Sequence, residues 1–165
     1  MRPLILIITS FLLVGCAATT TVHRGPDQTL KGRKVFFVEK FEGETNNFNN
    51  VLTAQFKALG YKALTGNSGA LPTTMKYDAF VTYYAVWYPG PDPVLYKLHI
   101  RIIDPTTQLM IAIGKAYRPY NRREDTDTVV KETLQAIFSS PDNVTQVHRG
   151  IIGEVLYGLA APKEQ

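Results

Sequence analysis

The sequence predicts an α+β domain, with a mixed sheet of about five strands and helices packed mainly on one face. Several runs are rich in β-branched and aromatic residues, which is typical of strands. Two segments repeat apolar residues at three- and four-residue intervals, which is typical of amphipathic helices. Clusters of Gly, Pro, Asn and Asp separate these runs. The expected order along the chain is β-α-β-β-β-α-α.

The first predicted unit is a strand, a helix and a second strand. Residues 34–41 (KVFFVEKF) are apolar on both faces, which indicates a central strand. Asn46 or Asn47 can cap the helix that follows, and Gly60 stands where a helix commonly ends. Residues 61–64 predict a short strand parallel to the first. The apolar positions of the helix are Phe48, Val51, Leu52, Phe56 and Leu59.

A strand and a hairpin come next. Residues 77–87 (YDAFVTYYAVW) predict the clearest strand, and residues 94–103 alternate apolar with basic side chains, as a half-exposed strand does. Asp104 and Pro105 favour a type I turn, after which residues 108–117 return as the partner strand. With a two-residue turn centred on Pro105 and Thr106, Ile102 would oppose Leu109, whereas a bulged turn would shift this register by one.

Two helices are expected near the C-terminus. Residues 127–138 carry a repeating apolar side and Asp residues near the helix start. Ser140 and Pro141 favour the start of a last helix, which would run to about Leu156. Gly150, Gly153 and Gly158 weaken that helix.

The N-terminus has the pattern of a secretion signal. Arg2 precedes an apolar run over residues 4–14, which is too short for a transmembrane helix. Leu13, Val14, Gly15 and Cys16 resemble the lipobox of bacterial lipoproteins, which implies cleavage before Cys16 and acylation of its thiol and new amino group. The alternative is an ordinary signal peptide whose Cys falls by chance at the end of the apolar run.

These features give three expected regions: a signal peptide over residues 1–15, the lipidated Cys16 with a flexible tether over 16–31, and one α+β domain over 32–160. Residues 17–31 lack periodic apolar positions, which indicates a tether. Because Ala17 rather than Asp follows Cys16, the resemblance implies the periplasmic face of the outer membrane. A Gram-positive cell surface remains the alternative.

Part of the chain also resembles the small α+β domain of Gram-negative envelope lipoproteins, including the curli-secretion group, the activators of penicillin-binding proteins and uncharacterised relatives. The likeness spans about residues 34–138 and rests on KVFFVEKFEG, GYKAL, YDAFVTYYAVW and IRIIDPTTQLMIAIGKAY. It implies a membrane-tethered periplasmic domain that binds envelope proteins. No segment matches a membrane-inserting hairpin pair, so a secretion pore is not implied.

The residues do not predict an enzyme, a metal site or a cofactor. Ser68, Ser139 and Ser140 are the serines after the signal, and none lies in a G-x-S-x-G elbow. His23, His99 and His148 have no metal-ligand spacing, and Cys16 is the only cysteine. A net charge of +4 in an exported chain does not indicate nucleic-acid binding.

Two groups of residues are candidates for an interaction surface. Lys97, His99 and Arg101 form a basic stripe, with Lys115 or Arg118 as possible neighbours, that could meet anionic lipid or an acidic protein. The plainer interpretation is the solvated face of an amphipathic strand. The second group could form a recognition loop or the edge of the core, and it consists of Trp87, Tyr88, Pro89, Pro91 and Pro93.

The function expected from the sequence is a lipid-anchored, non-catalytic interaction or assembly factor of the cell envelope. Its partners would be the membrane, through the Cys16 lipid, and an envelope protein. One alternative is a carrier of an apolar ligand, which needs a cavity lined by Phe37, Phe56 and Tyr83. A second alternative is an envelope hydrolase.

Overall fold

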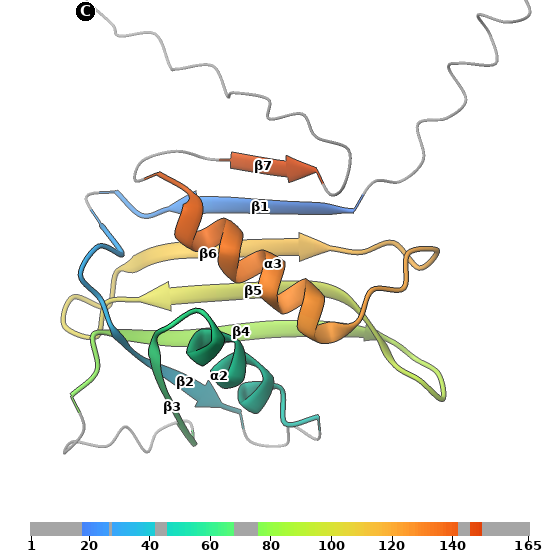
Figure 1. Ribbon diagram of the computed structural model, residues 1–165, viewed down its shortest axis with the longest axis horizontal. Helices are drawn as coiled ribbons and strands as arrows, with labels where there is room; N and C mark the ends of the chain where they lie inside the picture. The colour runs from blue at the N-terminus through green and yellow to red at the C-terminus, as the bar shows by residue number, and fades with distance from the viewer. Residues whose placement is uncertain (1–17, 27, 42–45, 68–75, 142–145, 150–165) are drawn as a thin grey trace, which may run out of the picture.

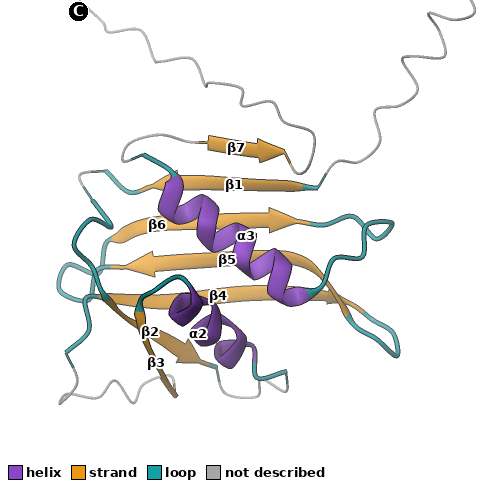
Figure 2. Ribbon diagram, viewed as in Figure 1, coloured by secondary structure: helices purple, strands orange, loops and turns teal. Residues whose placement is uncertain are grey.

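The computed structural model describes residues 18–26, 28–41, 46–67, 76–141 and 146–149, and forms one mixed sheet with two helices (Figures 1 and 2). The strands lie side by side in the order β3-β2-β4-β5-β6-β1-β7. The predicted α+β class is confirmed, and the sheet holds seven strands where about five were expected. The elements are β1 (Thr19–Arg24), β2 (Val35–Lys40), α2 (Phe48–Ala58), β3 (Lys62–Asn67), β4 (Ala79–Tyr88), β5 (Val94–Ile103), β6 (Met110–Tyr117), α3 (Thr126–Ser139) and β7 (Gln146–Arg149).

The β2-α2-β3 unit forms as predicted. Strand β2 pairs in parallel with both β3 and β4, which makes it a central strand. Helix α2 ends in a Schellman motif: the Gly60 N–H donates to the Lys57 carbonyl at 2.9 Å and the Tyr61 N–H to the Phe56 carbonyl at 3.1 Å. Gly60 has φ 89°, a conformation that glycine adopts without strain. At the other end, Asn47 is the N-cap but its side chain makes no capping hydrogen bond.

The register of the β5-β6 hairpin differs from the one that a two-residue turn would give. Ile102 lies opposite Ala112, and a β-bulge follows between Ile102 and Ile103. The chain turns over residues 105–108, closed by the Gln108 N–H on the Asp104 carbonyl at 2.9 Å. The Asp104 carboxylate accepts hydrogen bonds from the N–H groups of Thr106 and Thr107, which favours this wider turn. Leu109, expected on the apolar face, is therefore exposed.

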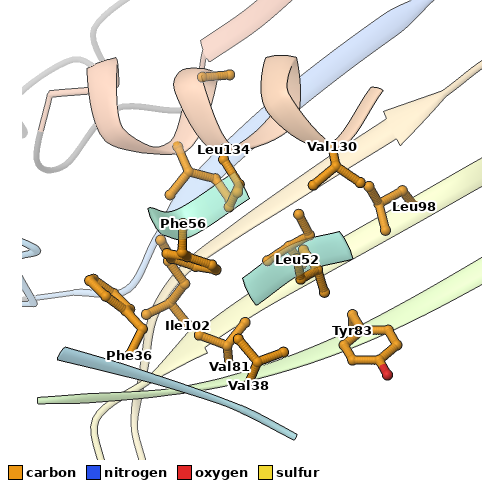
Figure 3. Close-up of a cluster of buried hydrophobic side chains, with 14 of the residues drawn as sticks. Phe36, Val38, Leu52, Phe56, Val81, Tyr83, Leu98, Ile102, Val130 and Leu134 are labelled. Carbon is orange, nitrogen blue, oxygen red and sulfur yellow. The ribbon is translucent and has the colours of Figure 1, made fainter. Parts of the chain in front are cut away.

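Both helices cover the same face of the sheet, as predicted (Figures 1 and 2). Helix α3 begins at the expected position, because the Asp125 side chain caps it by accepting the Thr128 N–H at 2.9 Å. The core fills the space between these helices and the sheet, and the aromatic rings of Phe36 and Phe56 stack within it at 4.8 Å (Figure 3). The other face of the sheet has no helix over it among the described residues.

Strand β1 lies inside the segment that was predicted to be a tether. It pairs antiparallel with β6 and buries Val22, so the domain begins at about Ala18 rather than at residue 32. The run of β-branched residues from Thr19 to Val22 explains why this segment forms a strand. Residues 1–17, with the predicted signal and Cys16, lie outside the described residues.

Strand β7 lies where the sequence predicted the last helix. It pairs antiparallel with β1, with Val22 opposite Gln146 and Thr19 opposite Arg149. The glycines that follow and the β-branched residues around Gln146 disfavour a helix here. The remainder of that predicted helix, from residue 150 on, lies outside the described residues.

Candidate functional site on the open face of the sheet

The alternation of side chains along β5 and β6 separates a covered face from an open one. Ile100 lies opposite Gly114, and a Cβ added to Gly114 would lie 2.7 Å from the Ile137 side chain of α3. This pair therefore faces the helices. Because successive side chains point to opposite faces, His99 and Lys115, which also lie opposite each other, face away from the helices.

The structure brings four basic residues together on the open face. Lys97, His99 and Arg101 follow one another on β5, and Lys115 of β6 lies beside His99. We call these four residues the basic stripe. Burial lowers the pKa of His99 below 6.5, and the charges of Lys115, Lys97 and Arg101 lower it further. The lowered pKa favours the neutral imidazole, so Lys97, Arg101 and Lys115 supply the positive charge of the stripe.

A groove lies beside the stripe, next to β4. Strand β2 pairs with β4 only up to Val38 opposite Val81, so the two strands diverge beyond this point. The groove that opens there has a volume of about 520 Å³. Tyr84, on the open face opposite His99, is 59% exposed and its ring centroid lies 5.8 Å from the imidazole. The lining residues are Glu39, Phe41, Thr82, Tyr83, Tyr84, His99 and Arg101.

A second hollow of about 480 Å³ lies on the β6 side of the stripe. Arg101 lines both this hollow and the groove, so its exposed guanidinium stands between them. Basic, apolar and uncharged polar side chains are mixed in the lining, which consists of His23, Arg101, Ile103, Gln108, Met110, Ile113 and Lys115. The open face therefore offers cations and apolar surface together, a combination that suits a partner with acidic groups.

The side chains of Trp87 and Tyr88, the two aromatic residues predicted as a recognition loop, make different contacts. Trp87 packs against the core, with its ring edge-to-face on Phe48 at 5.9 Å, so it occupies the edge of the core. Tyr88 lies at the end of β4 with its ring 4.7 Å from that of Tyr96. The pairing of β4 with β5 shifts between Val86 and Trp87, because β5 has an extra residue at this point.

Tyr88 belongs to a tyrosine cluster that sequence reasoning missed. Its ring meets Tyr120 edge-on at 5.1 Å, and Tyr96 meets Tyr117 at 5.3 Å. Tyr120 also accepts a hydrogen bond from Arg123 at 2.9 Å. We call Tyr88, Tyr96, Tyr117 and Tyr120 the tyrosine end of the sheet. Only the pairing of β4, β5 and β6 unites them, since they come from three separate runs of the sequence.

The described residues offer little that could hold a metal ion or span a bilayer. Among them, no three His, Cys, Asp or Glu side chains are grouped as metal ligands would be. Within the same ranges, neither helix has the length and apolar character needed to cross a membrane. Cys16 lies outside these ranges, so its acylation stays a prediction.

The class that these observations define is a helix-backed mixed sheet with one open, basic and aromatic face. The fold is similar to that of the PelC dodecamer from Paraburkholderia phytofirmans, with a TM-score of 0.53, 13% identity and coverage of 74% of this chain and 99% of that chain. TolB from Acinetobacter baumannii matches with a TM-score of 0.42 and 11% identity, over 86% of this chain and 41% of that chain. A minor lipoprotein from the same organism matches with a TM-score of 0.23 and 9% identity, over 61% of this chain and 86% of that one.

No family model and no curated protein matches the chain. The likeness to PelC supports a shared fold and, at 13% identity, nothing more specific. The two weaker likenesses add no further argument.

Proposed function

We propose that the protein is a lipid-anchored, non-catalytic interaction or assembly factor of the cell envelope, held on the periplasmic face of the outer membrane. The lipobox-like run ending at Cys16 supports the anchor. The open face of the sheet supports the interaction role, because no helix of the described ranges covers its basic and aromatic surface. The partner that this surface fits is an envelope protein with an acidic patch.

The observation that carries the proposal is the position of the basic stripe between two hollows. Arg101 reaches both hollows, and Lys115 flanks one of them. An acidic side chain seated there would meet several cations at once, with Tyr84 providing apolar contact area. The groove also holds Glu39, which would favour a partner carrying some positive charge at that point.

Self-association is a second proposal, supported by the shared fold with a protein that was solved as a dodecamer. The dodecamer is a property of that protein, so self-association of this chain is measured directly. Sedimentation of the detergent-solubilised protein tests it, with an assembly larger than a monomer as the expected result. A monomer at all concentrations would contradict it.

The geometry does not favour the apolar-ligand carrier. Phe56 stacks on Phe36 in the core, whereas Phe37 contacts Tyr77 and Phe80 on the other side of the sheet. Tyr83 contacts Phe41 and Phe48. The three residues named for such a cavity, Phe37, Phe56 and Tyr83, therefore do not surround one space.

Site-specific crosslinking tests the interaction role. A photoreactive phenylalanine analogue in place of Tyr84 should trap an envelope protein in living cells. The same analogue in place of Lys57, which is exposed on α2 over the covered face, is the matched control. Equal crosslinking at both positions, or none at Tyr84, would overturn the assignment of the open face.

A further inference from the structure

The sheet begins almost immediately after the predicted lipid attachment. Ala18 is only 1% exposed, and Thr19 already pairs with Tyr117 at the end of β6. The Thr19 carbonyl accepts a hydrogen bond from the buried Arg118 side chain at 3.1 Å. The start of β1 is thus fixed in the domain.

Chain geometry then limits how far the domain can lie from its anchor. Only two residue steps separate Cys16 from Ala18, which corresponds to at most about 7 Å of chain. A lipid on Cys16 would therefore hold the start of β1 at the membrane surface. The flexible tether expected from the sequence would have allowed a much larger separation.

The end of the sheet where β1 begins is the tyrosine end. Strand β1 begins at the end of the sheet where β6 ends (Figure 1). Thr19 lies opposite Tyr117, and Tyr120 follows β6 in the sequence. Tyr117 is 38% exposed and Tyr120 is 56% exposed. Tyrosine is enriched at membrane–water interfaces, because its ring prefers the apolar side and its hydroxyl the hydrated headgroups. Arg123, which stacks over Tyr120 at 5.2 Å, can keep its charge in the headgroup region.

We propose that the tyrosine end rests in the interfacial layer of the membrane that holds the Cys16 lipid. This inference rests on the proposed lipid anchor. The occupant is a bilayer surface, since the short connection brings that surface to this end of the sheet and to no other. The strands then lead away from the membrane, and the hairpin turn at residues 105–108 lies at the opposite end of β5 and β6. Strand β5 has 10 residues, so this turn lies about 33 Å from the tyrosine end.

Spin labels at three positions test this orientation. Acylation of Cys16 would consume the only native thiol, so a single introduced cysteine takes the label. The variants are Tyr120→Cys at the tyrosine end, Tyr84→Cys as an equally exposed tyrosine farther along the sheet, and Thr106→Cys at the hairpin turn. The full-length acylated protein is placed in vesicles of phosphatidylethanolamine and phosphatidylglycerol. Collision with oxygen, which enters lipid, is compared with collision with a water-soluble nickel complex.

The expected result is a severalfold higher ratio of oxygen to nickel accessibility at position 120 than at positions 84 and 106. Equal ratios at all three positions would overturn the inference. A label at position 120 that is shielded from both reagents would also overturn it, because it would indicate a protein contact.

Labelling and flotation of the wild-type protein distinguish a wrong orientation from a wrong lipid anchor. If wild-type Cys16 takes up label, or if the protein does not float with vesicles, the lipid anchor is wrong and the orientation is overturned with it. If the wild type floats and resists labelling but position 120 stays aqueous, only the orientation is wrong.

Discussion

The protonation of His99 on the open face depends on burial and on the neighbouring charges. Burial lowers its pKa most, and Lys115, Lys97 and Arg101 follow in that order. We expect Lys115→Met to raise the pKa of His99, because removing a like charge favours the protonated imidazole. The pKa should still lie below the ordinary value of a histidine, since burial and two cations remain. NMR titration of the imidazole protons measures this shift, and Lys57→Met on α2 is the control. An unchanged pKa would place Lys115 away from His99.

Asp104 couples the hairpin turn to pH. The Thr107 N–H, the Arg33 side chain and the Thr106 N–H donate to its carboxylate and lower its pKa from 3.8 to about 2. A carboxylate with a depressed pKa stabilises the fold above its unfolded pKa, and this contribution is lost as the pH falls through about 2. Urea unfolding at several pH values should show a smaller loss between pH 4 and pH 2 in Asp104→Asn. Asp92→Asn, in the exposed connection between β4 and β5, is the control substitution.

At the scale of elements, Arg118 joins three parts of the fold. Its side chain is 3% exposed, pairs with Glu124 at 2.5 Å and Glu132 at 2.6 Å, and donates to the Thr19 carbonyl of β1. We expect Arg118→Met to lower the free energy of unfolding by about 3 kcal/mol, because two carboxylates and a carbonyl lose their donor. The exposed Arg123→Gln should change it by less than about 1 kcal/mol. Equal effects in urea unfolding would contradict this bridging role.

Gly114 sets how closely α3 approaches β6. A Cβ at this position would lie 2.7 Å from Ile137 and 2.9 Å from Thr133, both β-branched and held by the helix. Gly114→Ala should therefore cost about 1–3 kcal/mol of unfolding free energy. In an Ile137→Ala background the cost should be smaller, because the new methyl group enters the vacated space. A double-mutant cycle measures this coupling, and additive effects would show that the two positions do not share the contact.

The elements that the sequence predicted are those with a strong local pattern. The apolar run of β2, the alternation in β4 and β5, and the helical spacing around Phe56 and Leu134 each identify an element without reference to the rest of the fold. Strand β1 is Thr-rich and has Val22 as its one aliphatic residue, and β7 has only four residues, so neither shows a strong apolar pattern and both depend on pairing with neighbouring strands. The hairpin register also depends on hydrogen bonds to the Asp104 side chain, which periodicity does not reveal.

The same distinction holds for the candidate site. Alternation along one strand was enough to place Lys97, His99 and Arg101 on one face. The neighbouring Lys115 and Tyr84 require the registers of two further strands. Trp87 was ambiguous because it stands beside the Pro-rich connector, and packing against Phe48 assigns it to the core side.

At the scale of the whole molecule, the anchor and the open face should act independently. Arg101 and Lys115 lie on the sheet surface, whereas Cys16 precedes the start of β1. We expect Arg101→Glu combined with Lys115→Glu to reduce capture of an acidic envelope partner severalfold, because the substitutions reverse the charge of the stripe. Fractionation with membranes should not change in this variant.

The reciprocal variant completes the test. Cys16→Ala should release the protein from the membrane fraction and leave its binding to an isolated acidic partner intact, as pull-downs with purified partner would measure. Raising the salt from 0.1 M to 1 M shortens the Debye length from about 10 Å to about 3 Å, so it should weaken partner binding through the stripe. Lipid anchoring should not respond to salt, because it depends on buried acyl chains. If charge reversal instead released the protein from membranes, the basic stripe would face the bilayer, and the orientation with the tyrosine end in the interface would be wrong.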